Sequence, residues 1–376
     1  MFRGHTRSLG ALLAASAVAA LPTTAAAAGP ATTSQTVSTP APSATTPGTA
    51  TSSATPAATT PSAPAATTPS APAATTPSAP AAKPARGSVT IYLRNAFFVQ
   101  REAVTVPHRV VHVVGIVHPY VSDQPVELRA FLGRRLIKSE QVRPLPSRNH
   151  TYGHFRVAIS SPGVGEVVVS ITHSGTAELA AFSAHRSFAA LDESVGFGST
   201  GRFVQLVQQR LAALHFYMPQ TGVYDQGTGL ALDAYHRLLH WGTYQTLDGR
   251  TVSFLLDGFG TFKVRYPNHG RHAEGNLSLQ LLALIDGAKV EAIYPISSGK
   301  PSTPTILGDF HVYSKVPGYL PDGMYFSNFF YSGYAIHGYD PAPDYPASHG
   351  CIRLPIVDAT SVYSWLAIGD WVDVYY

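Results

Sequence analysis

The chain has 376 residues, of which 45% are hydrophobic and 13% are charged, and its formal net charge is +4. This length allows two or three domains with buried cores, and the sequence has no run of like charges that would indicate a nucleic-acid surface. Its one cysteine, Cys351, excludes an intramolecular disulfide, a four-cysteine zinc site and a cysteine-bound iron–sulfur cluster.

Residues 1–28 have the pattern of a secretory signal peptide. Arg3 and Arg7 give a positive start, an apolar Ala-rich run covers 9–21, and small residues at 25–28 offer a cleavage site. The sequence therefore predicts an exported protein. An uncleaved membrane anchor is the alternative, but the apolar run is shorter than the ~20 residues of a typical span, so we expect no stable membrane span.

Residues 29–86 consist almost entirely of Ala, Thr, Pro and Ser, and the unit PAATTPSA occurs three times between Pro56 and Ala79. Proline favours an extended backbone and removes hydrogen-bond donors, and these small side chains cannot build a core. We interpret the segment as a disordered, extended spacer. A low-complexity tail without a function is the alternative.

Residues 87–190 predict a small β-sandwich. Strands are expected at 89–99, 110–117, 126–131, 136–142, 155–159 and 167–171. Six or seven short strands in ~100 residues indicate an immunoglobulin-like architecture. Nothing in this segment resembles a catalytic set, so we expect a stalk or a protein-contact module.

Residues 191–248 change to a helical pattern. Apolar side chains recur at helical spacing in two stretches, at Phe203, Val207, Leu211 and Leu214 and at Leu230, Ala234 and Leu238. We expect Ser199 or Thr200 to cap the first helix and Thr228 to start the second.

This helical segment resembles the small peptidoglycan-binding domain of bacterial wall enzymes. That family has a glycine-rich entry, a Val-x-x-Leu-Gln helix, an Asp-Gly-x-Phe-Gly loop and a Thr before the second helix. Here the loop Tyr224-Asp225-Gln226-Gly227 departs from the pattern and Val207 replaces the family's leucine. The resemblance implies glycan binding. A plain helical hairpin that bridges two domains is the alternative.

Residues 249–376 return to β-rich sequence. Asp286-Gly287 between two apolar runs is a strong hairpin signal, and a short helix is expected from Pro355 to Leu366. Strands are expected at 262–266, 279–285, 289–294, 309–313, 334–337 and 369–375. The sequence as a whole thus predicts a mainly β, multidomain fold.

The single thiol lies in a chemically suggestive stretch. Cys351 is preceded at two residues by His349 and at fourteen by His337, and each histidine is followed by a glycine. A thiolate is the nucleophilic form of cysteine, and a nearby imidazole can take the thiol proton or stabilise the thiolate as a cation. Arg353 offers a fork for a substrate carboxylate, and backbone N–H groups near Gly350 and Cys351 could form an oxyanion hole for acyl transfer.

This stretch resembles the catalytic domain of L,D-transpeptidases, often called the YkuD domain. The family pattern is an upstream His-Gly and then, after a gap, Ser/Thr-His-Gly-Cys-aliphatic-Arg. All of these positions match at His337-Gly338 and Ser348–Arg353, and residues 297–310 resemble the family's strand-and-turn entry. The resemblance covers roughly the last 125 residues, within our expected catalytic domain of 249–376.

The resemblance implies a role for each matched residue. Cys351 would attack the third residue of a donor stem peptide and form a thioester, and His337 would be the general base, its ring held by a carbonyl near Gly338. His349 would flank the thiol, Ser348 and Gly350 would shape the loop, and Arg353 and Gly338 would contact substrate. The product would be a 3→3 cross-link.

The implied partners are peptidoglycan stem peptides and glycan, with carbapenems as inhibitors, at the cell wall, in the periplasm or on the extracellular face. We expect no cofactor, no metal and no nucleic acid. The alternatives for the whole protein are an L,D-carboxypeptidase that trims terminal D-alanine with water, and a non-catalytic protein that binds the cell wall.

Local alternatives also remain. Cys351 could be an inert buried thiol, or could bind zinc together with His337 and His349. We expect His269, His272 and His311 to be structural or on the surface and Asp340 and Asp344 to be solvated. Met324–Tyr334 is expected to supply core and cleft wall, with a flap over the cleft as a further reading.

Overall fold

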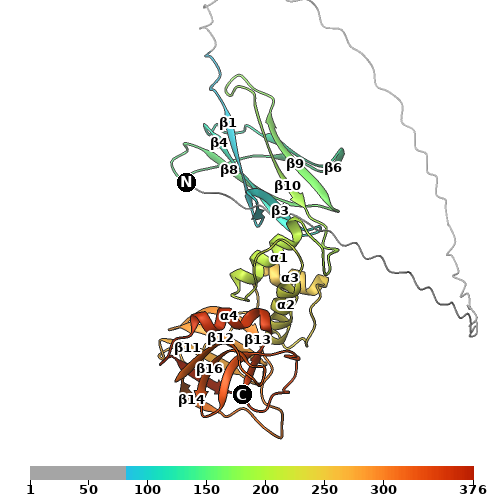
Figure 1. Cartoon of the computed structure of the whole chain (residues 1–376). Helices are drawn as coiled ribbons and strands as arrows, with labels where there is room; N and C mark the ends of the chain where they lie inside the picture. The colour runs from blue at the N-terminus through green and yellow to red at the C-terminus, as the bar shows by residue number, and fades with distance from the viewer. Residues whose placement is uncertain (1–81) are drawn as a thin grey trace, which may run out of the picture. The chain divides into compact units, whose positions relative to one another are not determined.

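The computed structural model describes residues 82–376 (Figure 1). The predicted signal peptide and nearly all of the predicted spacer lie outside these residues. The expected end of the spacer at Arg86 is too late. Ala85 already forms a parallel bridge with Leu179, through Ala85 N–H to the Glu178 carbonyl (2.8 Å) and Ala180 N–H to the Ala85 carbonyl (2.8 Å).

The first segment is a two-sheet β-sandwich, as predicted (Figure 1). One sheet has the order β1-β4-β8-β7 and the other β2-β3-β10-β9-β5-β6. The strands are β1 (Ser88–Arg94), β2 (Phe97–Val99), β3 (Glu102–Thr105), β4 (Val110–His118), β5 (Val126–Leu132), β6 (Arg135–Val142), β7 (Leu145–Pro146), β8 (Gly153–Ser160), β9 (Gly165–His173) and β10 (Phe182–Ala190). Buried and exposed side chains alternate along β8, since neighbouring residues of a strand face opposite sides of a sheet. The buried faces form one apolar cluster, in agreement with the predicted immunoglobulin-like architecture.

The helical segment contains the two predicted helices and one that the pattern did not reveal. They are α1 (Arg202–Ala213), α2 (Gln226–Leu238) and α3 (Gly249–Asp257). The expected cap of α1 is wrong: Gly201 precedes the helix without a side-chain cap among the described residues, because Ser199 Oγ instead accepts from Gly196 N–H (3.1 Å). In α2 the cap is Asp225, whose carboxylate accepts from Thr228 N–H (2.9 Å), so Thr228 lies within the first turn.

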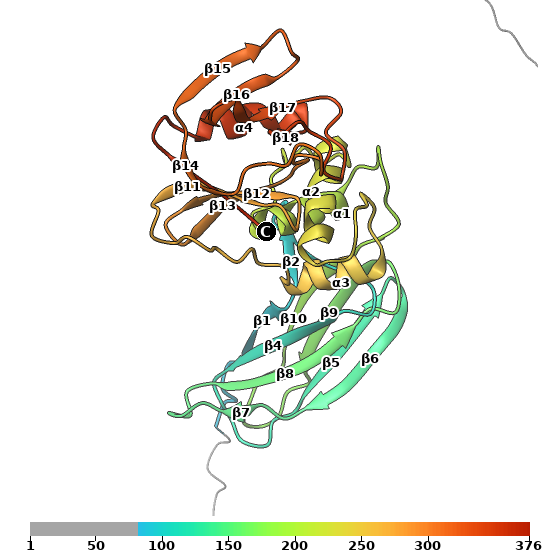
Figure 2. The ribbon, with the colours of Figure 1, turned by 90° about the horizontal axis from the view of Figure 1, so that it is seen from below.

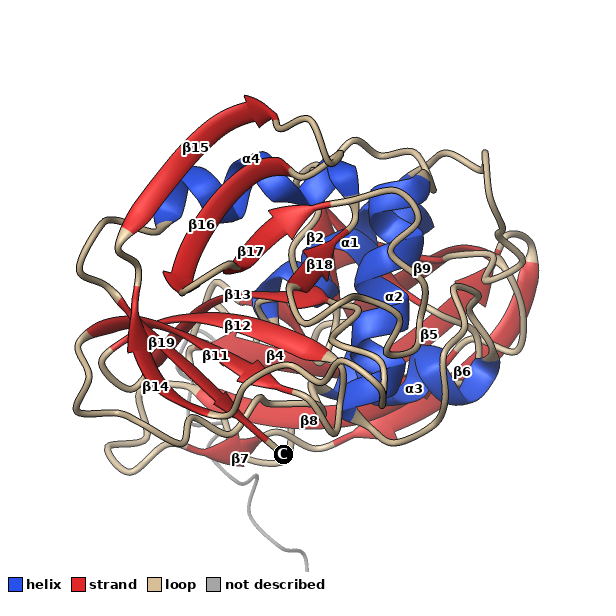
Figure 3. Cartoon of the chain, turned by 60° about the horizontal axis from the view of Figure 1, so that its bottom comes forward, coloured by secondary structure: helices blue, strands red, loops and turns tan. Residues whose placement is uncertain are grey.

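The C-terminal segment has two sheets, ordered β13-β12-β11-β19-β14 and β15-β16-β17-β18 (Figures 2 and 3). Helix α4 (Ile356–Trp365) packs on β16 and β17. The strands are β11 (Arg271–Asn276), β12 (Leu281–Asp286), β13 (Lys289–Pro295), β14 (Gly308–His311), β15 (Ser314–Tyr319), β16 (Tyr325–Tyr331), β17 (Tyr334–Gly338), β18 (Ile352–Leu354) and β19 (Trp371–Tyr375). An apolar cluster from both sheets and α4 forms the core.

The strand expected at 262–266 is absent from the described structure. The backbone N–H groups of Arg265 and Tyr266 donate to the buried carboxylate of Glu274 (2.8 and 2.7 Å), where a strand would need a backbone partner. The same carboxylate accepts from the Tyr375 hydroxyl (2.6 Å). A side-chain acceptor thus takes the backbone N–H bonds of this segment in place of a neighbouring strand. The alternation of apolar residues in the sequence does not reveal such a partner.

The helices share a core with both neighbouring segments. Leu206 and Leu211 of α1 and Leu232 of α2 belong to one buried cluster with Leu281 of β12 and Val104 of β3. Among residues 82–376, no helix is long and apolar enough to cross a membrane.

Candidate active site

The parallel pair β17–β18 brings the two parts of the thiol motif together. His337 lies opposite Arg353 in the register of the pair. The neighbours Ile336 and Ile352 belong to the buried apolar core, so strand alternation places His337 and Arg353 on the other face. Cys351 comes directly before β18, and its Sγ reaches the turn between β16 and β17. The strand pairing therefore brings the two parts of the motif to the same strand pair.

The His337 ring is fixed in one orientation. Its Nδ1 lies 2.9 Å from the carbonyl oxygen of Gly338, which only accepts, so Nδ1 carries the proton and Nε2 is left as an acceptor. Burial, reinforced by the charge of Arg353, lowers the pKa of His337 to about 4. The imidazole is therefore neutral at pH 7 and can accept a proton. The structure thus contains the carbonyl contact that the sequence predicts near Gly338.

Cys351 is a free, partly buried cysteine. Burial raises the pKa of its thiol, against the opposing effects of a backbone hydrogen bond at Ala335 and the charge of Arg353. Sγ donates to the carbonyl oxygen of Gly333, at 3.6 Å, in the turn between β16 and β17. The resting pair is thus a protonated thiol and a neutral imidazole, and proton transfer must accompany attack by sulfur.

Ser348 closes the turn that carries Cys351. Its hydroxyl donates to the Cys351 carbonyl (2.5 Å) and accepts from Gly350 N–H (3.0 Å). Gly350 has a φ of 123°, and a Cβ there would lie 2.5 Å from the Tyr334 ring. Ser348 and Gly350 thus both form part of this turn. The Gly350 N–H is occupied by Ser348, which leaves the expected oxyanion-hole role without that donor in this structure.

Arg353 and His349 have partners that the sequence did not indicate. The Arg353 guanidinium lies 3.9 Å from the centre of the Tyr339 ring, and the His337 ring meets the same ring edge-on at 5.8 Å. His349 Nε2 lies 3.2 Å from Lys300 Nζ. Because an ammonium group only donates, Nε2 is the acceptor in this contact.

The tip of the β15–β16 hairpin borders this cluster, just before the segment Met324–Tyr334 for which the sequence allows a flap. A Cβ on Gly323 would lie 3.3 Å from the Tyr339 ring, so the tip is in contact with Tyr339. The charge of Asp322 beside it raises the pKa values of His337 and Cys351. Tyr325 pairs with Gly338 in the adjacent ladder. Tyr339 and Asp322 are not part of the sequence motif. They lie near its residues because of the strand pairing in this sheet.

The remaining candidate residues lie elsewhere. His272 is fully buried, 3.3 Å from the Glu274 carboxylate, and His269 lies 3.1 Å from Asp373. His311 Nδ1 lies 2.9 Å from the Gly369 carbonyl. Among residues 82–376, no three His, Cys, Asp or Glu side chains group closely enough to hold a metal ion.

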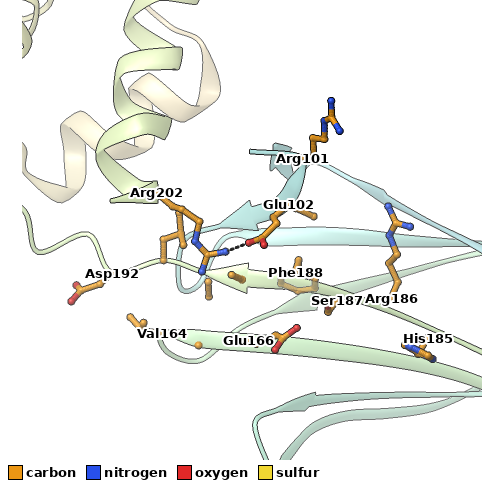
Figure 4. A pocket seen from close by; sticks show the side chains of 15 residues that line it. Arg101, Glu102, Val164, Glu166, His185, Arg186, Ser187, Phe188, Asp192 and Arg202 are labelled. Atoms are coloured by element: carbon orange, nitrogen blue, oxygen red, sulfur yellow. Dashed lines mark hydrogen bonds and ion pairs between the residues drawn. The ribbon is translucent and has the colours of Figure 1, made fainter. Parts of the chain in front are cut away.

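A separate hollow of about 690 Å³ lies on the β-sandwich (Figure 4). Arg101, Glu166, His185 and Arg186 line it, and an ion pair joins Glu102 to Arg202 at its rim. None of its lining residues belongs to the thiol cluster. The charges there are of both signs, so the hollow does not define one class of ligand.

A thiol, a neutral imidazole on the neighbouring strand and a tightly turned glycine loop form the kind of site that cysteine acyl-transfer enzymes use. Residues 270–374 match the family model of YkuD, the L,D-transpeptidase catalytic domain. The chain therefore carries an L,D-transpeptidase catalytic domain in its C-terminal segment, as the motif predicts. The predicted peptidoglycan-binding domain upstream of these residues stays a prediction.

A comparison with curated proteins found no match. Among solved structures, an L,D-transpeptidase from Xylanimonas cellulosilytica is 28% identical over 49% of this chain and 98% of its own, with a TM-score of 0.44. The catalytic domain of an L,D-transpeptidase from E. faecium is 27% identical over 28% of this chain and 98% of its own, with a TM-score of 0.26. An L,D-transpeptidase from Mycobacterium tuberculosis H37Rv is 23% identical over 28% and 58%, with a TM-score of 0.27.

Proposed function

We propose that this protein is an exported peptidoglycan L,D-transpeptidase that forms 3→3 cross-links through a thioester on Cys351. The catalytic domain at 270–374 indicates an acyltransferase-type enzyme. The observation that supports the finer proposal is the pairing of β17 with β18, which sets His337 opposite Arg353, two residues after Cys351, with the His337 Nε2 left as an acceptor.

In the first half-reaction His337 Nε2 takes the Cys351 thiol proton as sulfur attacks the carbonyl of the third residue of the donor stem peptide. The bond to the terminal D-alanine then breaks. D-Alanine leaves as an amine after receiving the proton from His337, and a thioester remains. The neutral imidazole and the protonated thiol of the resting site match this sequence of proton transfers.

In the second half-reaction the side-chain amine of an acceptor stem attacks the thioester carbonyl. His337 accepts the amine proton and returns a proton to the departing sulfur, so Cys351 regains its thiol. Arg353 has its guanidinium on the site's face over Tyr339, where it can bind a peptide carboxylate. If water replaces the amine, the same steps give an L,D-carboxypeptidase.

The test is the intact mass of the full chain after incubation with a carbapenem. We expect one adduct per chain, and no adduct on the variant Cys351→Ala. An adduct that persists in Cys351→Ala would contradict the assigned nucleophile. A chain with no adduct and no D-alanine release from a stem tetrapeptide would contradict the acyl-transfer function and favour a wall-binding protein.

A second measurement separates the two enzymatic outcomes. The full chain is incubated with the tetrapeptide in the presence and absence of an acceptor amine, and products are identified by mass. A cross-linked dimer supports transfer, whereas release of D-alanine with tripeptide as the sole product in both samples supports the carboxypeptidase. Sedimentation of Cys351→Ala with purified cell-wall sacculi tests wall binding separately.

A further inference from the structure

Helix α2 contributes a buried arginine to the C-terminal sheet. The side chain of Arg237 is only 5% exposed, and its Nη2 pairs with Asp233 Oδ2 at 2.6 Å. Its Nη1 donates to two backbone carbonyls, of Gln280 (3.0 Å) and Ile296 (2.9 Å). These carbonyls flank the open end of the β12–β13 hairpin, so the guanidinium ties the helix to the point where the chain leaves β13.

Gln280 continues the connection with its side chain. Its Oε1 accepts from Ser298 N–H (2.9 Å), and its Nε2 donates to Ser298 Oγ (2.8 Å) and to the Leu277 carbonyl (2.7 Å). Gln280 is 7% exposed and Ser298 is 2% exposed, so water competes little for these bonds. The amide of Gln280 therefore fixes the backbone at Ser298.

Ser297 and Ser298 hold both sides of the loop that carries Cys351. The carbonyl of Ser298 accepts from Ser348 N–H (3.0 Å), three residues before the cysteine. The backbone of Ser297 exchanges two hydrogen bonds with Arg353, each of 2.9 Å, two residues after it. An unbroken set of buried contacts thus runs from α2 to the two ends of the loop.

We propose that Gln280 and Arg237 are positioning residues for Cys351, and that helix α2 is thereby a working part of the catalytic unit. Its role is then more than the wall attachment that the sequence suggests. A displacement of a reacting group by about 1 Å can cost on the order of 100-fold in rate, so a loop held from both sides is sensitive to this anchor. The expected loss of turnover rests on the proposed function. The claim that the two residues position the Cys351 thiol does not depend on it.

The test compares two buried glutamines in the full chain. Gln208 in α1 has the same kind of network, with bonds to Gly222 N–H (2.8 Å), the Val223 carbonyl (3.0 Å) and Thr228 Oγ1 (2.8 Å), but none of these bonds leads to the thiol loop. Gln280→Met and Gln208→Met each remove one buried amide without changing its length much. The readouts are kcat and KM for D-alanine release from a tetrapeptide, and the rate of Cys351 alkylation by iodoacetamide against pH.

We expect Gln280→Met to lower kcat by about tenfold or more with KM changed by less than about twofold, because binding contacts remain while the thiol is displaced. Its alkylation profile should shift along the pH axis. Gln208→Met, measured where both variants are folded by circular dichroism, should keep the wild-type kcat and profile. Equal behaviour of the two variants overturns the proposal.

Arg237→Lys covers the case in which Gln280→Met does not fold. Lysine keeps a cation beside Asp233 but loses the fork that reaches both carbonyls. A lowered kcat and a shifted alkylation profile support the proposal, and wild-type values for both overturn it. If the wild-type chain releases no D-alanine, the proposed function fails, and the alkylation profiles alone still decide whether the two residues place the thiol.

Discussion

His337 and Arg353 lie directly opposite each other in the parallel pair β17–β18, and Cys351 comes two residues before Arg353. The charge of Arg353 lowers the pKa values of both His337 and Cys351. One residue thus makes the imidazole harder to protonate and the thiol easier to ionise. Both effects help a neutral Cys–His pair to work without a permanent thiolate.

Arg353→Met should lower kcat/KM for the tetrapeptide by about 10–100-fold, since a hydrogen bond to a charged group contributes about 1.5–3 kcal/mol. It should also raise the pKa of His337, because the neighbouring positive charge is gone. Arg353→Lys is the control. It keeps the positive charge, so the pKa of His337 and the acid limb of the pH profile should stay as in the wild type, while the planar stack on Tyr339 is lost. A pH profile that is the same in both variants would argue against the electrostatic role.

The pH dependence of carbapenem acylation follows from the buried imidazole. With the pKa of His337 at about 4, the base is unprotonated from neutral pH down to about 5, so the acylation rate should hold over that range and fall about tenfold per pH unit below 4. The measurement is the second-order rate of adduct formation by mass spectrometry between pH 3.5 and 8. A midpoint near 6.5 would mean that the ring is solvated and not buried.

Gly350 provides a steric test of the loop. An added methyl group would lie 2.5 Å from the Tyr334 ring, at a φ of 123° that side chains rarely adopt. Gly350→Ala should therefore cost about 1–3 kcal/mol from overlap and a similar amount from backbone strain, and should abolish acylation. Gly249→Ala is the matched control, because its Cβ would meet nothing within 4 Å. Thermal melting and carbapenem adducts of both variants check this, and an active, stable Gly350→Ala would contradict the close packing.

The motif and the strands could be predicted for a physical reason. His337, Ser348 and Cys351 match the pattern of a known family within one short stretch of sequence. In β8 the burial of one sheet face makes buried and exposed residues alternate. Strand β10 was missed because its centre, His185-Arg186-Ser187, is exposed and polar. Helix α3 was missed because it has only nine residues and begins at the expected boundary between the helical and the catalytic domain.

The residues that hold the site in place could not be recognised from their neighbours in the sequence. Gln280 contacts Ser298 across eighteen positions and Arg237 contacts Ile296 across fifty-nine. Such contacts depend on which strand ends the fold brings together, and a single sequence does not give that. The low pKa of His337 likewise comes from burial, which follows from the pairing of β17 with its neighbours and not from the residues beside it.

Asp358 in the first turn of α4 should set the pH dependence of stability near neutrality. Its residue is 2% exposed, and Oδ2 has no hydrogen-bond partner among residues 82–376. Burial raises the pKa of this carboxyl from 3.8 to about 7. Between these values the folded chain binds more protons at this site than the unfolded chain, so its contribution to the free energy of unfolding falls as the pH rises from about 4 to 7.

Asp358→Asn removes the buried charge and should therefore stabilise the fold at pH 8, by about 1–3 kcal/mol, the cost of an unsatisfied buried group. The gain should shrink towards pH 4, where the wild-type carboxyl is protonated. Thermal melting of both proteins at pH 4.5, 6 and 8 measures the difference. Asp286→Asn at the exposed end of β12 is the control and should change stability by less than about 0.5 kcal/mol at every pH. A gain from Asp358→Asn that is the same at all three pH values would show that the carboxyl does not titrate in this range.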